Sequence, residues 1–171
     1  NLTVRKQALG VLGRLDHGAG IMPLVDLAAP ANGPLLSREA TSVLASSGDP
    51  RARAYLRSAV QRDDLSDEAM AIAIRALGQQ YSTQQDAALL RTAYPRVHSE
   101  TSRDAIVTAV GDAGGADNVK WLLDLAKNEA ETSARRRKAV DNASRAGAPI
   151  ADLVAVYDGI TDPATKEGLV A

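Results

Sequence analysis

The sequence predicts an all-α chain of stacked helical hairpins, and three observations support this. The 171 residues are rich in Ala, Leu and Val, yet include no Phe, one Trp and four Tyr. This composition suits closely packed helices better than a β-sandwich, which favours β-branched and aromatic residues. One outline of two amphipathic stretches joined by a corner recurs about every 33 residues along the chain. A single hairpin cannot bury its apolar face alone, whereas stacked neighbours can.

The first helix of each copy is anchored on one position. The anchors, at spacings of 32, 33, 33 and 33, are Ala8, Ala40, Ala73, Ile106 and Ala139. Gly168 follows in the same column after 29 residues. Apolar residues one and four positions after each anchor share a helix face with it. The residues four positions after are Leu12, Leu44, Leu77, Val110 and Ala143.

Small residues mark the end of each first helix and the corner after it. The fifth position after the anchor holds Gly13, Ala45, Gly78, Gly111 and Ser144, which predicts a close approach by a partner helix. The eighth position holds Asp16, Gly48, Tyr81, Gly114 and Gly147. Gly at this place ends a helix, and Pro50 or Pro149 then helps to start the next.

A second helix follows each corner. Its predicted buried positions in the five copies are Ile21, Leu24, Val25 and Ala28; Leu56, Ala59 and Val60; Leu89, Leu90 and Ala93; Val119, Leu122, Leu123 and Ala126; and Ile150, Leu153, Val154 and Tyr157. The fifth copy fits only with a shift of two residues. The whole chain, 1–171, is then one domain with copies at about 1–33, 34–65, 66–98, 99–130 and 131–161, plus a partial copy at 162–171.

The outline R-x-x-A-x-x-x-L-G-x-x-G-D-P resembles the short bacterial HEAT-like repeat, the kind found in phycobilisome-lyase-type arrays. The residues that carry it are Arg5, Ala8, Leu12 and Gly13; Arg38, Ala40, Leu44, Gly48, Asp49 and Pro50; Leu77 and Gly78; and Arg103, Val110, Gly111 and Gly114. The resemblance implies a right-handed α-α superhelix, a HEAT-like solenoid of about five hairpins plus the start of a sixth. Most members of this family are interaction modules, with rare lyases, DNA-repair enzymes and hydroxylases among them.

Charge and cysteine content exclude several classes of function. The net charge is -1, which provides no overall basic footprint for nucleic acid or an anionic membrane. No cysteine is present, so disulfides, zinc-thiolate sites and thiol catalysis are excluded, and either the cytosol or an exported compartment fits. No apolar run approaches the roughly 20 residues of a membrane span. Because the chain begins at Asn1 and stops inside a new helix at Ala171, we expect a fragment or processed product.

Four groups of residues could in principle form sites, but the sequence favours a structural role for each. His17 and His98 are expected in solvated loops, too far apart to share a metal. The basic run 135–138 points around most of a helix, so it is expected to be a solvated helix start. Asp67 and Glu68, after Ser66, are expected to favour the start of a helix. The Gly-rich stretch 111–115 follows a helix and lacks the Lys-Ser/Thr of a phosphate loop. We therefore expect no metal, no cofactor and no catalytic residue.

One surface is the candidate partner site. Tyr55 and Trp121 each precede the buried Leu of their second helix, in a column of varied residues. Together with Arg53, Arg57 and Lys120 they form the predicted partner surface, because aromatic residues and Arg are the usual anchors of interfaces. The alternative is that both rings only fill the edge of the core.

The predicted function is a non-catalytic protein-protein interaction or scaffold module, within a larger protein. The alternatives are a bilin lyase-like enzyme, which rests on the resemblance, and a nucleic-acid-binding HEAT-like domain. The partial sixth copy also predicts an exposed apolar end at Leu169 and Val170, and hence self-association.

Overall fold

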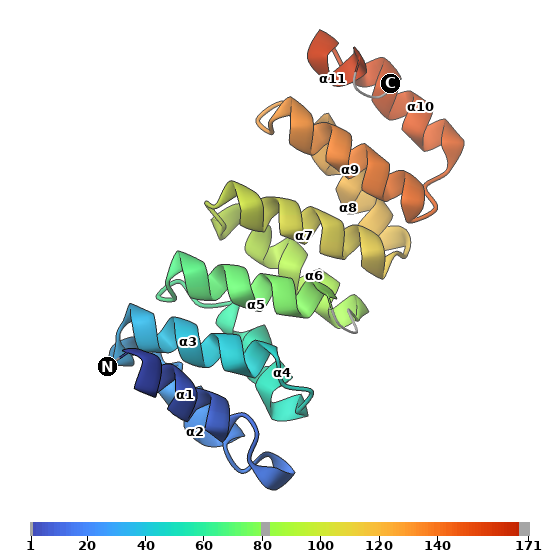
Figure 1. The fold of residues 1–171 in the computed structure, drawn as a ribbon. Helices are drawn as coiled ribbons and strands as arrows, with labels where there is room; N and C mark the ends of the chain where they lie inside the picture. The colour runs from blue at the N-terminus through green and yellow to red at the C-terminus, as the bar shows by residue number, and fades with distance from the viewer. Residues whose placement is uncertain (1, 80–82, 168–171) are drawn as a thin grey trace. The chain divides into compact units, whose positions relative to one another are not determined.

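The computed structural model describes residues 2–79 and 83–167, and every regular element within these ranges is a helix. The all-α prediction is therefore confirmed. The described helices form two compact units, unit 1 spanning 1–80 and unit 2 spanning 81–171. Figure 1 shows their order along the chain. Among the described residues, no helix is long and apolar enough to cross a membrane.

Unit 1 contains five α-helices and two short 3-10 turns among its described residues. The α-helices are α1 (Leu2–Leu12), α2 (Ile21–Leu27), α3 (Pro34–Ala45), α4 (Pro50–Ala59) and α5 (Asp67–Gln79), with 3-10 turns at Asp16–Gly18 and Pro30–Asn32. Helix α3 packs against α1, α2, α4 and α5, and α4 also packs against α2 and α5. Helices α3 and α5 are first helices of the predicted pattern, and each contacts the two α-helices that precede it.

The described part of unit 2 follows the same order. Its α-helices are α6 (Gln84–Ala93), α7 (Glu100–Ala113), α8 (Ala116–Lys127), α9 (Ser133–Arg145), α10 (Ile150–Gly159) and α11 (Pro163–Glu167), with a 3-10 turn at Tyr94–Arg96. Helix α7 packs against α6, α8 and α9, while α9 packs against α7, α8, α10 and α11. Helix α10 packs against α8 and α9.

Side-chain caps fix where several helices begin. The Asp49 carboxylate accepts a hydrogen bond from the backbone N–H of Arg51 (2.8 Å) and caps α4, which Pro50 starts. At α6, Thr83 and Asp86 form a capping box, with each side chain accepting from the other residue's backbone N–H. These bonds satisfy N–H groups that have no partner within the helix.

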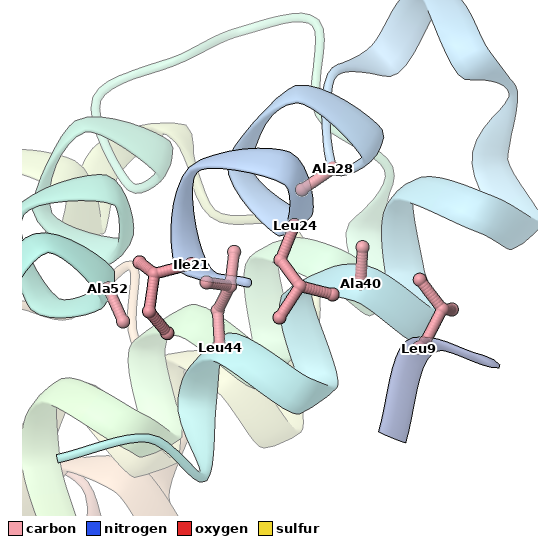
Figure 2. Packing of buried hydrophobic residues seen from close by; sticks show 7 residues of the cluster. All are labelled: Leu9, Ile21, Leu24, Ala28, Ala40, Leu44 and Ala52. Atoms are coloured by element: carbon pink, nitrogen blue, oxygen red, sulfur yellow. The ribbon is translucent and has the colours of Figure 1, made fainter. Parts of the chain in front are cut away.

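The anchor column lies in the core, except in its first member. Ala40, Ala73, Ile106 and Ala139 are fully buried, whereas Ala8 is exposed. Figure 2 shows the core around Ala40 in unit 1, which consists of Leu9, Ile21, Leu24, Ala28, Ala40, Leu44 and Ala52. Small side chains in this cluster let the helices approach closely.

Close approach is also visible at glycines of the small column. A Cβ on Gly13 would lie 2.5 Å from Val43 Cγ1 on α3. A Cβ on Gly111 would lie 2.6 Å from Asn142 Oδ1 on α9. Real Cβ atoms do not approach that closely, so at both positions the glycine makes room for a side chain of the next first helix.

The second helices largely follow the prediction in four copies, where Val25, Leu89 and Val119 are half-buried instead of buried, and depart from it in the fifth. The predicted residues found buried are Ile21, Leu24 and Ala28; Leu56, Ala59 and Val60; Leu90 and Ala93; and Leu122, Leu123 and Ala126. In α10 the prediction is wrong, because Val156 and Ile160 are buried while Ile150 is 80% exposed and Val154 52% exposed. Leu153 and Tyr157 are half-buried. Val156 and Ile160 stand 34 residues after Leu122 and Ala126, so α10 buries the face equivalent to that of α8.

Four positions named in the predictions fall outside the described residues. These are the corner residue Tyr81, the last anchor Gly168, and the apolar end at Leu169 and Val170.

Candidate protein-binding surface

Tyr55 is half-buried on α4 and contacts the end of α2. Its hydroxyl donates a hydrogen bond to the backbone carbonyl of Ala28 (3.3 Å) and shares another with the Thr41 hydroxyl (3.2 Å). Ala28 is the residue after the last turn of α2, where helix carbonyls lack an internal partner. The Tyr55 side chain therefore joins α4 to α2 and α3, and only part of its ring faces solvent.

Trp121 on α8 occupies the corresponding place in unit 2. Its ring meets the buried ring of Tyr94 edge-on, with 5.2 Å between centroids and 83° between planes. Tyr94 follows the last turn of α6, as Ala28 follows that of α2. Edge-to-face pairs of this kind stabilise beyond simple burial by about 0.5–1.5 kcal/mol. Trp121 is also half-buried, so it contributes to the interior of unit 2 as well as to its surface.

Tyr94 is the centre of a mixed aromatic and charged group. The Arg103 guanidinium lies over its ring, 4.6 Å from the centroid. The buried Tyr94 hydroxyl is near the Glu131 carboxylate but outside hydrogen-bond geometry. Burial of the phenol, followed by the influence of Glu131, raises the pKa of Tyr94, so this side chain stays neutral at physiological pH.

A buried guanidinium, Arg135, lies beside this group. Its Nη1 donates to Glu131 Oε2 (2.9 Å), its Nε donates to Asp104 Oδ1 (2.9 Å), and Glu100 accepts a third bond. The side chains of Arg135 and Glu131 are only 2% and 4% exposed. Burial opposes the charge of Arg135, but the hydrogen bonds from Glu100, Glu131 and Asp104 outweigh it and raise the pKa of Arg135. Arg135 therefore remains charged, and its bonds to Glu100 and Asp104 hold α9 to α7.

The expectation of a solvated basic run at 135–138 is wrong for its first two members. Arg135 and Arg136 are both buried. Arg136 Nε donates to the backbone carbonyl of Ala126 (2.9 Å), at the end of α8. The helix turns these two side chains toward α7 and α8, where carboxylates and a carbonyl accept their N–H groups.

The structure places the five predicted partner residues on two helices. Arg53, Tyr55 and Arg57 lie on α4 in unit 1, and Lys120 and Trp121 lie on α8 in unit 2. The two arginines are half-buried, whereas Lys120 is exposed.

A groove of about 700 Å³ runs beside Lys120, between α8 and the start of α10. Val119 and Leu123 contribute apolar walls from α8, and Pro149 and Ala155 contribute from the side of α10. Charged side chains of both signs line the same groove, namely Lys120, Asp124, Lys127 and Asp152. An apolar floor with a charged rim is the usual anatomy of a surface that binds a peptide or a helix.

The two histidines and the acidic residues near Ser66 lie at the surface or in a helix cap. His17 and His98 are exposed, and His17 has a positive φ of 54°. Ser66 Oγ accepts from the backbone N–H of Ala69 (3.3 Å), and Asp67 and Glu68 stand in the first turn of α5, in agreement with the predicted cap. Within residues 2–79 and 83–167, no three His, Asp or Glu side chains gather as a metal site.

Sequence reasoning missed the Arg135 cluster. A signal for it was present, because Glu131 and Arg135 stand four residues apart, the spacing of a helical ion pair. Glu131 lies just before α9 and not within it, so the sequence does not identify the two residues as a pair on one helix.

In comparisons with known proteins, no family model matches the chain and no curated protein matches it.

Proposed function

We propose that this chain is a non-catalytic protein-binding or scaffold module, folded as a HEAT-like helical repeat. The observation that carries the proposal is the groove between α8 and α10, with apolar walls and charged residues of both signs along its rim. A preformed groove of this kind binds a partner segment with little reorganisation, which favours affinity.

Contacts that recur within the two units support the repeat interpretation. Tyr55 meets Ala28 in unit 1 and Trp121 meets Tyr94 in unit 2, each across a sequence separation of 27 residues. The first contact joins α4 to the end of α2, and the second joins α8 to the end of α6. The right-handed superhelix and the number of hairpins stay predictions.

Burial of the basic run argues against the nucleic-acid alternative. Arg135 and Arg136 donate their hydrogen bonds inside unit 2, so these two side chains are not available to phosphates. Phosphate contacts require exposed cations that follow the backbone of the nucleic acid. The lyase alternative rests on the resemblance alone and is not part of the proposal.

A peptide selection tests the groove directly. A displayed library of peptides is selected on the immobilised chain, and the affinity of each selected peptide is measured by fluorescence anisotropy. We expect Lys120→Glu and Val119→Asp to weaken binding about tenfold or more, since each change places an unfavourable charge in the groove. Arg75→Glu, at an exposed position of α5 in unit 1, is the matched control and leaves affinity unchanged.

A second arm tests the α4 residues, with Arg57→Glu as the variant. Loss of affinity for some selected peptides would place the α4 surface in the interface as well. If no selected peptide responds to any change in the groove or on α4, the proposed binding surface is wrong.

A further inference from the structure

The exposed face of α8 carries a row of charges that alternate in sign. Asp117, Lys120, Asp124 and Lys127 follow one another at spacings of three, four and three residues, so they share one side of the helix. All four are exposed, and among the described residues none of their side chains takes part in a hydrogen bond or an ion pair. The row is therefore available to charges on another molecule.

The stability of α8 itself explains only the two outer members of this row. Asp117 in the first turn and Lys127 in the last turn suit the helix dipole. Lys120 stands four residues before Asp124, which is the weaker order for an ion pair within a helix. Asp124 also lies in the last turn, where a carboxylate opposes the dipole. The two inner charges thus contribute little to their own helix.

The row is complementary to itself when two α8 helices meet in opposite directions. Positions 117 and 127, and positions 120 and 124, are both centred on position 122. In an antiparallel pair with a two-fold axis at this level, Asp117 of each copy faces Lys127 of the other, and Lys120 faces Asp124. A parallel pair in register, or an antiparallel pair shifted by three residues, would instead bring like charges together. Because like charges in contact are unfavourable, the row specifies one orientation and one register.

The groove beside this row provides the apolar part of such a contact. Val119 and Leu123 on α8 and Pro149 and Ala155 on the side of α10 line its space of about 700 Å³. Lys120, Asp124 and Lys127 line the same groove. Exposed ion pairs contribute only about 0–1 kcal/mol each, so the apolar walls supply most of the affinity and the charges set the geometry.

We propose that the chain forms a two-fold symmetric dimer in which α8 of each copy lies antiparallel in the α8–α10 groove of the other. This inference rests on the proposed function, because it uses the same groove, and it identifies the partner as a second copy of the chain. The contact joins the same surface on both copies, so it closes at the dimer.

Exchange of the two inner charges tests the proposal. Lys120→Glu alone places like charges opposite each other at two places in the dimer, and Asp124→Lys alone does the same with the other sign. The double variant, Lys120→Glu with Asp124→Lys, restores opposite charges at both places. Asp141→Lys, at an exposed position of α9, and Arg75→Glu, at an exposed position of α5, are the matched controls. Circular dichroism checks that every variant remains helical.

Molar mass is measured by sedimentation and light scattering from low micromolar to near-millimolar concentration. We expect the unmodified chain, the double variant and both controls to form dimers and to grow no further. Each single variant should associate about tenfold or more weakly, because its two-fold contact repeats the unfavourable pair. An equal mixture of the two single variants should form dimers again, because each introduced charge then faces an opposite charge on the other copy.

Several results would overturn the proposal. These are a monomeric unmodified chain at every concentration, assembly past the dimer, a single variant that associates as tightly as the unmodified chain, a double variant as weak as the single ones, and a mixture that stays monomeric. Failure of the proposed function is distinguishable from these results. If the chain is monomeric but selected peptides bind and respond to Lys120→Glu, the groove is a protein-binding surface and only the second copy as its partner is wrong.

Discussion

Replacing Arg135 by Met should destabilise unit 2 by about 3 kcal/mol or more, because it leaves the buried Glu131 carboxylate short of a partner. Glu131 is 4% exposed, and its remaining cation is Arg103, with 3.3 Å between Nη2 and Oε1. Glu100 and Asp104 also lose a bond, but their side chains are 65% and 42% exposed and can be solvated instead. The loss is therefore concentrated in one pair.

The assay is urea denaturation followed by the fluorescence of Trp121, the chain's single Trp, which lies in unit 2 against Tyr94. The double variant Arg135→Met with Glu131→Leu should recover much of the loss, since the buried Glu131 charge is then removed. Arg103 loses its carboxylate partner, but its side chain is 24% exposed and can be solvated. Lys127→Met, at an exposed site on α8, is the control for loss of a cation. The reasoning fails if the single variant costs less than about 1 kcal/mol, or if the double variant is as unstable as the single one.

Two further predictions concern local geometry and acid stability. Gly20→Ala should destabilise unit 1 by about 1–3 kcal/mol, because a Cβ there would lie 1.9 Å from the Leu12 carbonyl oxygen. Gly48→Ala is the control, since a Cβ at Gly48 has no atom within 4 Å and the change should be nearly neutral. Both variants are compared with the unmodified chain by thermal melting. The side-chain hydrogen bond from Arg51, aided by its backbone N–H, lowers the pKa of Asp49 to about 2. A carboxyl whose pKa is lowered in the folded state stabilises the fold at pH values above its unfolded pKa, and this stabilisation is lost as the pH falls toward the folded pKa. The stability difference between the unmodified chain and Asp49→Asn should therefore shrink from pH 4 to pH 2. A difference that stays constant over this range would contradict the prediction.

Most of the helical order could be predicted from the sequence, because the period and the small corner residues are local signals. The buried residues of the first four second helices were predicted largely as found. In α10 two apolar rows compete. The row through Ile150 and Val154 has the longer helical pattern, but the row through Val156 and Ile160 is the one that meets α8 and α9. Periodicity alone cannot decide which of two rows a neighbour covers.

The candidate site was predicted less completely, for a different reason. The sequence predicts Tyr55 and Trp121 as a pair of similar positions, and the structure gives both a similar internal contact. The sequence could not show that Arg135 and Arg136 are buried, because charged residues are rarely buried without partners. Those partners, on α7 and at the end of α8, are distant in sequence.

The carbonyls at the ends of α2 and α8 each accept a hydrogen bond from a side chain of the following helix, and these two donors differ in size. Ser37 Oγ donates to the Ala28 carbonyl (2.7 Å), while Arg136 Nε donates to the Ala126 carbonyl (2.9 Å). A short hydroxyl and a long guanidinium need different amounts of room, although they satisfy the same kind of carbonyl. Exchanging the helix pair around α2 with the pair around α8 would therefore crowd one carbonyl and leave the other without a donor. The helix pairs are thus not freely interchangeable in protein engineering.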